Sequence, residues 1–162
     1  MAQTFEFRCP QQIAFGPGTL RTLGTTVRGF GSHALLVTGS ASLRSSGRLD
    51  ECIKLLDEAG ATCTHVIVDG EPSPEGIDDA VRTHGTGRID VVVAVGGGSA
   101  IDFGKAVAAM LPVGGSVSDY LEGVGTKRHP GTTLPLVAVP TTAGTGSEAT
   151  KNAVLSEPGD HG

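Results

Sequence analysis

Residues 90–105 read DVVVAVGGGSAIDFGK, and this stretch decides the fold class of the chain. Residues 90–95 form a short apolar run rich in β-branched side chains, which predicts a strand buried on both faces. Three glycines follow, and residues 99–110 are predicted to form a helix that ends before Pro112. A buried strand that turns through glycines into a helix is typical of α/β proteins with a parallel sheet.

Apolar runs and amphipathic segments alternate on both sides of this stretch. Further strands are predicted at residues 34–38, 66–68 and 134–139. The side chains predicted to face the core from two intervening helices are Leu49, Cys52, Ile53, Leu56 and Ala59, then Ile77, Ala80 and Val81. The order predicts right-handed crossovers and a Rossmann-like α/β fold, with helices on both faces of a mostly parallel sheet.

The first 30 residues follow a different pattern. Phe5 and Phe7 alternate with polar residues, and the spacing of Pro17, Leu20, Leu23 and Val27 indicates a helix. We expect this segment at the edge of the sheet. No linker or internal repeat interrupts the sequence, so residues 1–162 are interpreted as one domain.

Composition excludes several classes of partner. Lys and Arg total 12 against 17 Asp and Glu, a formal net charge of −5. A nucleic-acid or anionic-membrane surface needs excess positive charge, so neither partner is expected. The longest purely apolar stretch, residues 106–111, is far shorter than the roughly 18 residues of a membrane span.

Cysteine usage points to a reducing compartment. Cys9, Cys52 and Cys63 form no CxxC pair, and their odd number does not suit a disulfide framework. No export signal is recognised at the N-terminus. We therefore expect a cytoplasmic location.

Ligands of such sheets bind beyond the carboxyl ends of the strands, which singles out the turns at residues 39–40, 96–99 and 140–148. The glycines at 96–98 expose N–H groups at a helix N-terminus, where an anion such as a diphosphate is favoured. The alternative is structural, because Ser99 and Asp102 have the spacing of a capping box, with Lys105 as a solvated ion-pair partner.

The third turn, residues 140–148, reads PTTAGTGSE and carries four hydroxyl groups. Serine and threonine can close a loop by local hydrogen bonds alone. Beside a phosphate-binding turn, the same hydroxyls suit recognition of ribose and phosphate.

Two of these segments resemble the signatures of the iron-containing (group III) alcohol dehydrogenases. Residues 96–105, GGGSAIDFGK, resemble the signature GGGSxxDxAK, and residues 140–150, PTTAGTGSEAT, resemble the second signature almost letter for letter. Residues 15–18, 71–74 and 119–123 show weaker similarity to the same family. The resemblance implies the N-terminal nucleotide-binding domain of the dehydroquinate synthase-like superfamily.

In that family the GGGS turn holds the diphosphate of NAD(P), and the TT-containing loop contacts the nucleotide. Asp102 would then face the nucleotide cleft, and Gly104 replaces the usual alanine, which is consistent with tight packing. The cofactor-binding residues predicted in this way, together with the turn after the first strand, are Gly39, Ser40, Gly96, Gly97, Gly98, Ser99, Asp102, Thr141, Thr142 and Thr145.

The chain departs from the family pattern after the first strand. Many members carry an Asp there that accepts hydrogen bonds from the adenosine ribose, whereas this chain has Gly39. Without that carboxylate a 2′-phosphate meets no like charge, and Ser40, Ser42 or Arg44 can donate to it. NADP(H) is therefore favoured over NAD, unless Gly39 only permits a tight turn.

The second departure is length. The family has a further helical domain, in which an Asp and three His residues bind a divalent metal (iron or zinc), and this chain stops before it. Its own histidines, interpreted as surface or loop residues without metal-ligand spacing, are His33, His65, His84, His129 and His161. No catalytic or metal-binding residue is predicted, and the isolated chain is expected to be inactive.

In a complete enzyme the resemblance implies hydride transfer between an alcohol and its aldehyde or ketone. The implied partners are the dinucleotide and a small alcohol or carbonyl compound, and a homo-oligomer is left open. Alternatives are a related reductase such as maleylacetate reductase, or a stand-alone nucleotide-binding or regulatory domain. A dehydroquinate-synthase-like lyase is a further alternative, against which the PTTAGTGSE loop weighs.

Overall fold

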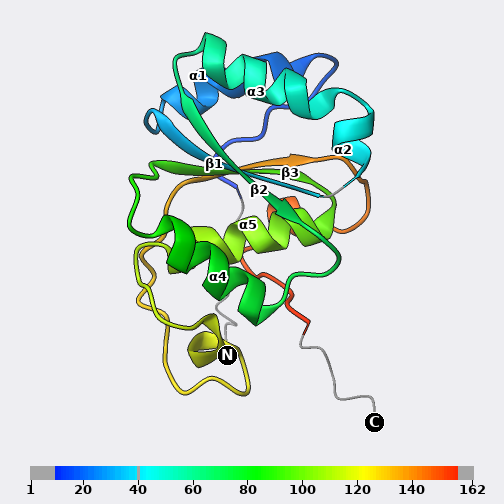
Figure 1. Cartoon of the computed structure of the whole chain (residues 1–162). Helices are drawn as coiled ribbons and strands as arrows, with labels where there is room; N and C mark the ends of the chain where they lie inside the picture. Colours follow the sequence, from blue (N-terminus) through cyan, green and yellow to red (C-terminus); the bar gives the residue numbers. More distant parts are fainter. Residues whose placement is uncertain (1–9, 40, 157–162) are drawn as a thin grey trace, which may run out of the picture.

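The computed structural model describes residues 10–39 and 41–156. Four parallel strands form one sheet in the order β2-β1-β3-β4 (Figure 1). Their bounds are β1 His33–Gly39, β2 Thr62–Val68, β3 Val91–Gly96 and β4 Leu136–Pro140. Each lies where the alternating pattern predicts a strand, and all pairs are parallel.

Helices cover both faces of the sheet, with α1 and α3 on one side and α4 and α5 on the other (Figure 1). The α-helices are α1 Leu23–Arg28, α2 Ser42–Ser45, α3 Arg48–Glu58, α4 Pro74–His84 and α5 Gly98–Met110. Short 3-10 helices lie at η1 Thr19–Thr22, η2 Val117–Tyr120 and η3 Ser147–Ala149. This arrangement confirms the predicted α/β class.

The core is divided by the sheet into two layers. On β1, Leu35 and Val37 pack toward α4 and α5, whereas Ala34 and Leu36 pack toward α1 and α3. Every residue of β3 is buried. Burial on both faces is the reason that β1 and β3 read as continuous apolar runs rather than as alternating ones.

The N-terminal helix exists as predicted, but its expected position at the sheet edge is wrong. Leu23 and Val27 are buried in the core layer that contains Leu36, so α1 lies over a face of the sheet. It packs so tightly on α3 that a Cβ on Gly24 would lie 2.2 Å from the Leu55 carbonyl oxygen. Phe5 and Phe7 lie outside the described residues.

Helix α3 follows the predicted spacing with one exception. Leu49, Cys52 and Leu56 are buried, but Ile53 is 37% exposed. Consecutive residues of a helix are rotated by about 100°, so Ile53 turns away from the sheet that Cys52 contacts.

Helix α5 is held unusually close to the sheet at Gly104. A Cβ at this position would lie 2.7 Å from the Cβ of Ala94 on β3, closer than side-chain carbons approach. The tight packing expected at Gly104 from the sequence is therefore present. The close approach fixes the first turn of α5 beside the carboxyl end of β3. Among the helices of residues 10–39 and 41–156, none is both long and apolar enough to cross a membrane.

Candidate functional site

Three of the predicted turns meet at the carboxyl edge of the sheet. Gly96 pairs with Pro140 in the β3–β4 register, and the Thr141 amide donates to the Gly96 carbonyl oxygen at 2.9 Å. A Cβ built on Gly96 would lie 3.6 Å from the Gly39 nitrogen at the end of β1. The ends of β1, β3 and β4 thus lie within a few atoms of one another.

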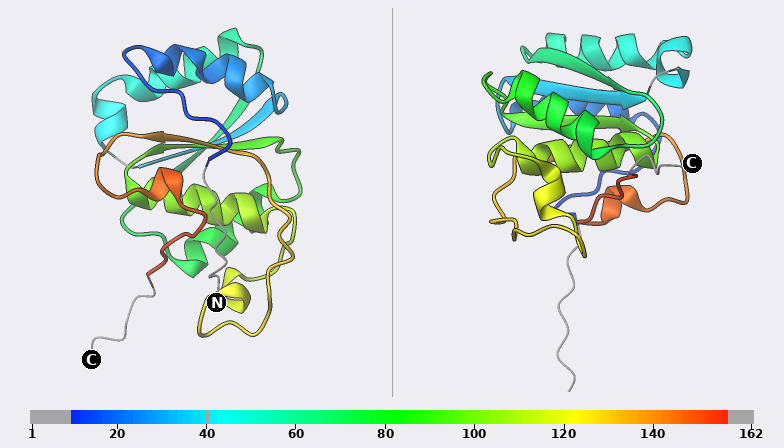
Figure 2. Two further views of the ribbon diagram at one scale, coloured as in Figure 1. Left: turned by 180° about the vertical axis from the view of Figure 1, so that it is seen from behind. Right: turned by 60° about the horizontal axis from the view of Figure 1, so that its bottom comes forward.

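The hydroxyl-rich loop lies directly against the glycine turn. A Cβ on Gly97 would be 3.5 Å from the Thr142 hydroxyl oxygen, and one on Gly98 would be 3.2 Å from the Thr145 methyl carbon. The same Gly98 position faces the Ser147 hydroxyl at 3.3 Å. Figure 2 shows η3, which begins at Ser147, lying beside α5. The two glycines leave a narrow space between turn and loop that any side chain would fill.

The first turn of α5 has no side-chain cap. Its N-cap is Gly97, in an extended conformation with φ −78° and ψ −170°, and no side chain accepts from the first amides. Ser99 is exposed in this turn. Uncapped amides at the positive end of a helix dipole form a ready site for an anion. The capping-box alternative for Ser99 and Asp102 is wrong.

Asp102 is engaged elsewhere. Its Oδ1 lies 2.8 Å from the Lys105 Nζ, and both side chains are only 9% exposed. Its Oδ2 accepts from the Val154 amide at 3.3 Å, and Lys105 donates to the Thr150 hydroxyl at 3.1 Å. The ion pair expected from the spacing is present, but it is buried rather than solvated, because residues 150–154 cross α5 above it.

The end of β1 offers open space. A Cβ on Gly39 would meet no atom within 4 Å, so the position has room for a side chain. Ser42 and Arg44 are exposed on α2, which follows directly. Ser40, the remaining predicted residue of this turn, lies outside the described residues.

Sequence reasoning missed a contact between β1 and β2. The Thr38 Oγ1 lies 2.8 Å from the His65 Nε2, and Thr38 is 1% exposed. Burial, with a smaller contribution from the positive charge of Arg44, lowers the pKa of His65 below its usual value. His65 is therefore not a loop residue: it is half-buried on β2, the strand at one edge of the sheet, and its ring is held against Thr38. No local motif marks this contact, since it depends on the pairing of two strands.

The residues at this edge fit a dinucleotide. Gly97 and Gly98 form a cradle that a Cβ would fill, the first turn of α5 is uncapped, and the adjoining loop supplies exposed Thr141, Thr142 and Thr145. The described residues do not fit a metal ion in this way. In the part of the chain that the structure describes, no three His, Cys, Asp or Glu side chains are grouped to hold one.

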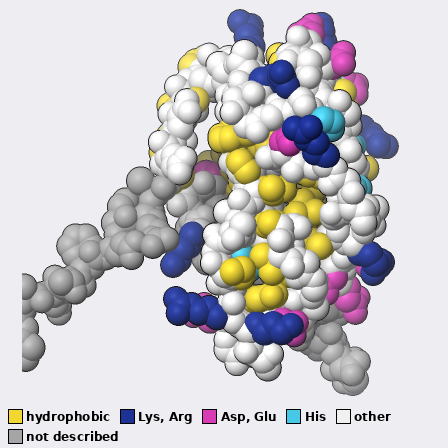
Figure 3. Space-filling view, turned by 90° about the vertical axis from the view of Figure 1, so that its left-hand side faces the viewer, with side chains coloured by type: hydrophobic (Ala, Val, Ile, Leu, Met, Phe, Trp, Pro, Cys, Tyr) yellow, Lys and Arg dark blue, Asp and Glu magenta, His cyan; other side chains and the backbone are white. Residues whose placement is uncertain are grey.

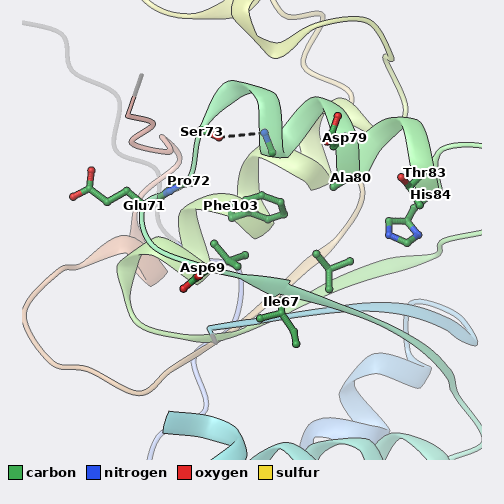
Figure 4. A pocket seen from close by; sticks show the side chains of 13 residues that line it. Ile67, Asp69, Glu71, Pro72, Ser73, Asp79, Ala80, Thr83, His84 and Phe103 are labelled. Atoms are coloured by element: carbon green, nitrogen blue, oxygen red, sulfur yellow. Dashed lines mark hydrogen bonds between the residues drawn. The ribbon is translucent and has the colours of Figure 1, made fainter. Parts of the chain in front are cut away.

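A separate groove of about 310 Å³ lies between β2 and α4, over the ring of Phe103 (Figure 4). The Ser73 hydroxyl at its end accepts from the Gly76 amide at 3.2 Å and caps α4. Its lining includes three carboxylates, those of Asp69, Glu71 and Asp79. This negative lining is unsuited to a diphosphate, and the groove includes neither the glycine turn nor the hydroxyl-rich loop.

A parallel sheet covered on both faces, with a glycine turn leading into an uncapped helix at its carboxyl edge, defines a Rossmann-like α/β domain. Within that class, the chain belongs to the iron-containing alcohol dehydrogenase family, whose family model matches residues 10–162.

Relatives and solved structures agree with this assignment. The chain is 36% identical over 157 residues to a probable NADH-dependent butanol dehydrogenase of Bacillus subtilis, covering 95% of this chain and 39% of the relative. An archaeal halo-thermophilic alcohol dehydrogenase from a Red Sea brine pool superposes with a TM-score of 0.87 at 32% identity, over 96% of this chain and 41% of that one.

A sulfoacetaldehyde reductase from Bifidobacterium kashiwanohense, solved in complex with NAD+, superposes with a TM-score of 0.77 at 30% identity. That match covers 92% of this chain and 39% of the reductase. The chain thus spans about two fifths of the length of the relatives that it matches.

Proposed function

We propose that this chain is the dinucleotide-binding domain of an iron-type alcohol dehydrogenase. In the complete enzyme, hydride would pass between an alcohol and its aldehyde or ketone. The observation that carries the proposal is the uncapped first turn of α5, which faces the hydroxyl-rich loop across the space at Gly97 and Gly98.

The proposed role of the chain is to hold and orient the cofactor. The amides of Gly97, Gly98 and Ser99 would bind the diphosphate, because they are unsatisfied donors at the positive end of α5. Thr141, Thr142 and Thr145 would line the adenosine and phosphate side. Bound NAD(P) supplies the hydride chemistry, and the protein supplies position. The described residues offer no ligand set for iron or zinc, so the proposal for this chain is limited to the dinucleotide.

NADPH is proposed to bind at least as tightly as NADH. The open space at Gly39 means that a 2′-phosphate meets no carboxylate there, and Arg44 follows on α2. The relative from Bacillus subtilis carries NADH dependence in its name, so the proposal of NADPH binding rests on the residues of the present chain alone.

Fluorescence titration of the 162-residue chain with NADH and NADPH tests both parts of the proposal. We expect saturable binding of both, and we expect Gly39→Asp to weaken NADPH binding about tenfold or more through like-charge repulsion. Because Gly39 has room for a side chain, Gly39→Asn is a matched, uncharged control that should weaken NADPH binding less than Gly39→Asp. If neither nucleotide binds the unsubstituted chain, the proposal is wrong.

A homo-oligomer is part of the same proposal. Phe15 is 97% exposed, Ile13 75% and Val124 74%, and Figure 3 shows hydrophobic side chains gathered along the middle of one face with charged ones around them. Uncovered apolar surface of this kind favours association. Sedimentation velocity should therefore show the weight-average mass rising with concentration, and a monomer at all concentrations contradicts the expectation.

A reducing, cytoplasmic compartment is also proposed. Cys52 on α3 is buried and Cys63 on β2 is half-buried, and both are free thiols. Burial raises the pKa of Cys52 to about 11 and also raises the pKa of Cys63, so both thiols stay protonated and unreactive. Such cysteines serve as small core residues rather than as disulfide partners.

A further inference from the structure

His65 is held at the edge of the nucleotide site by a buried hydroxyl. Thr38 immediately precedes Gly39, the predicted cofactor-binding residue at the end of β1, and its Oγ1 contacts the His65 Nε2 at 2.8 Å. Thr38 is 1% exposed and His65 is half-buried, so the contact holds one side of the imidazole ring against the core. In the described part of the chain, the second ring nitrogen, Nδ1, has no hydrogen-bond partner, which leaves it for a ligand.

The surroundings of His65 contain a cation and no paired carboxylate. Arg44 from α2 is the charged group close enough to affect the titration of His65. On the same face of β2 lies the neutral thiol of Cys63, with Cys52 beyond it on α3, and β1 contributes the Thr38 hydroxyl. Within residues 10–39 and 41–156, no carboxylate forms an ion pair with His65 or Arg44.

We propose that His65, positioned by Thr38 and acting beside Arg44, is a specificity-determining residue that binds the 2′-phosphate of NADPH. The inference rests on the proposed function, because it requires that a dinucleotide occupy the glycine turn. It goes further in assigning the recognition of one phosphate to a side chain from the second strand, outside the turn that follows β1.

The proposal requires a proton to be taken up with NADPH. In the free chain burial and Arg44 favour neutral imidazole, whereas an adjacent phosphate dianion favours the imidazolium and raises the pKa of His65. The contribution of His65 to the affinity for NADPH is therefore fully present at low pH. It is lost as the pH rises through the pKa that His65 has in the NADPH complex. NADH has no 2′-phosphate and should show no such dependence.

The test compares His65→Gln with the unsubstituted chain by titration with NADPH and NADH at pH 6 and pH 8.5. Glutamine keeps a polar group that can reach Thr38 but does not titrate. Losing a charge-assisted hydrogen bond should weaken NADPH binding about fivefold to tenfold at pH 6 and less than about twofold at pH 8.5. NADH affinity should not change. The titration of the phosphate itself, near pH 6, is common to both proteins and cancels in the comparison.

Two further variants separate recognition from a structural effect. His84→Gln, on α4 at the opposite face of the sheet, should leave the affinity of both nucleotides unchanged. Arg44→Gln changes an exposed side chain, so it should not unfold the chain. It should weaken NADPH binding at both pH values, because it removes a cation from the phosphate site. It should also shift the loss of NADPH affinity to higher pH, because it removes the like charge that opposes protonation of His65.

The outcomes are distinct. If both nucleotides bind but His65→Gln weakens them equally, or weakens neither, the assignment of His65 to the 2′-phosphate is wrong and the proposed function stands. If neither nucleotide binds the unsubstituted chain, the proposed function fails and this inference fails with it. A loss confined to NADPH that is equal at both pH values contradicts the protonation of His65.

Discussion

Gly98→Val is expected to abolish dinucleotide binding, with affinity for NADH and NADPH falling together by about a hundredfold or more, because the diphosphate would lose charge-assisted hydrogen bonds to the helix amides. The first carbon of the new side chain would lie 3.2 Å from the Thr145 methyl carbon and 3.3 Å from the Ser147 hydroxyl. Its two methyl groups would occupy the space between turn and loop. The diphosphate could then no longer approach the amides of α5.

The size of the side chain provides a graded series. Gly98→Ala adds only the Cβ and should weaken binding less than valine, because Thr145 can shift by a few tenths of an ångström. Gly76→Ala is the matched control: its Cβ would have ordinary contacts at 3.4 Å to the Ser73 hydroxyl and 3.5 Å to the Phe103 ring, within α4. Isothermal titration with thermal melts checks binding and folding together. Unchanged affinity for Gly98→Val would show that the nucleotide does not lie against this glycine.

The strands were predictable from the sequence because their burial is local in origin. A strand covered on both faces is apolar at nearly every position, so the apolar runs of β1 and β3 identify them in the sequence. The face on which α1 lies was not predictable. It depends on contact between Gly24 and the backbone of Leu55, residues that the pattern of neither helix relates to the other.

The candidate site likewise has parts that could be predicted from the sequence and parts that could not. The glycine turn and the hydroxyl-rich loop are continuous segments, and parallel topology brings the ends of their strands to one edge. The contact between Thr38 and His65 joins residues 27 apart, and it becomes visible only when the β1–β2 register is known. Spacing also predicts the pairing of Asp102 with Lys105, but not its burial, which is produced by the segment around Val154, 52 residues from Asp102.

Lys105→Met is expected to produce the largest loss of stability, about 3 kcal/mol in the free energy of unfolding, because breaking a buried ion pair leaves an uncompensated charge. For a chain of this length, that loss corresponds to a fall in melting temperature of about 6–12 °C. The carboxylate of Asp102 would remain 9% exposed with no cation, and the lysine bond to Thr150 would also be lost. Differential scanning calorimetry measures both the melting temperature and the free energy of unfolding.

A double substitution distinguishes the buried charge from the loss of packing. Asp102→Asn combined with Lys105→Met removes both charges, so it should be more stable than Lys105→Met alone, whereas additive losses would contradict a coupled pair. Lys54→Met is the control, because the Lys54–Glu58 pair is 75% and 59% exposed and such pairs contribute less than about 1 kcal/mol. Residues 150–154 follow the hydroxyl-rich loop and are tied by this pair to the helix that begins at the glycine turn. Loosening the pair should therefore also weaken nucleotide binding, even though neither of its side chains contacts the glycine turn.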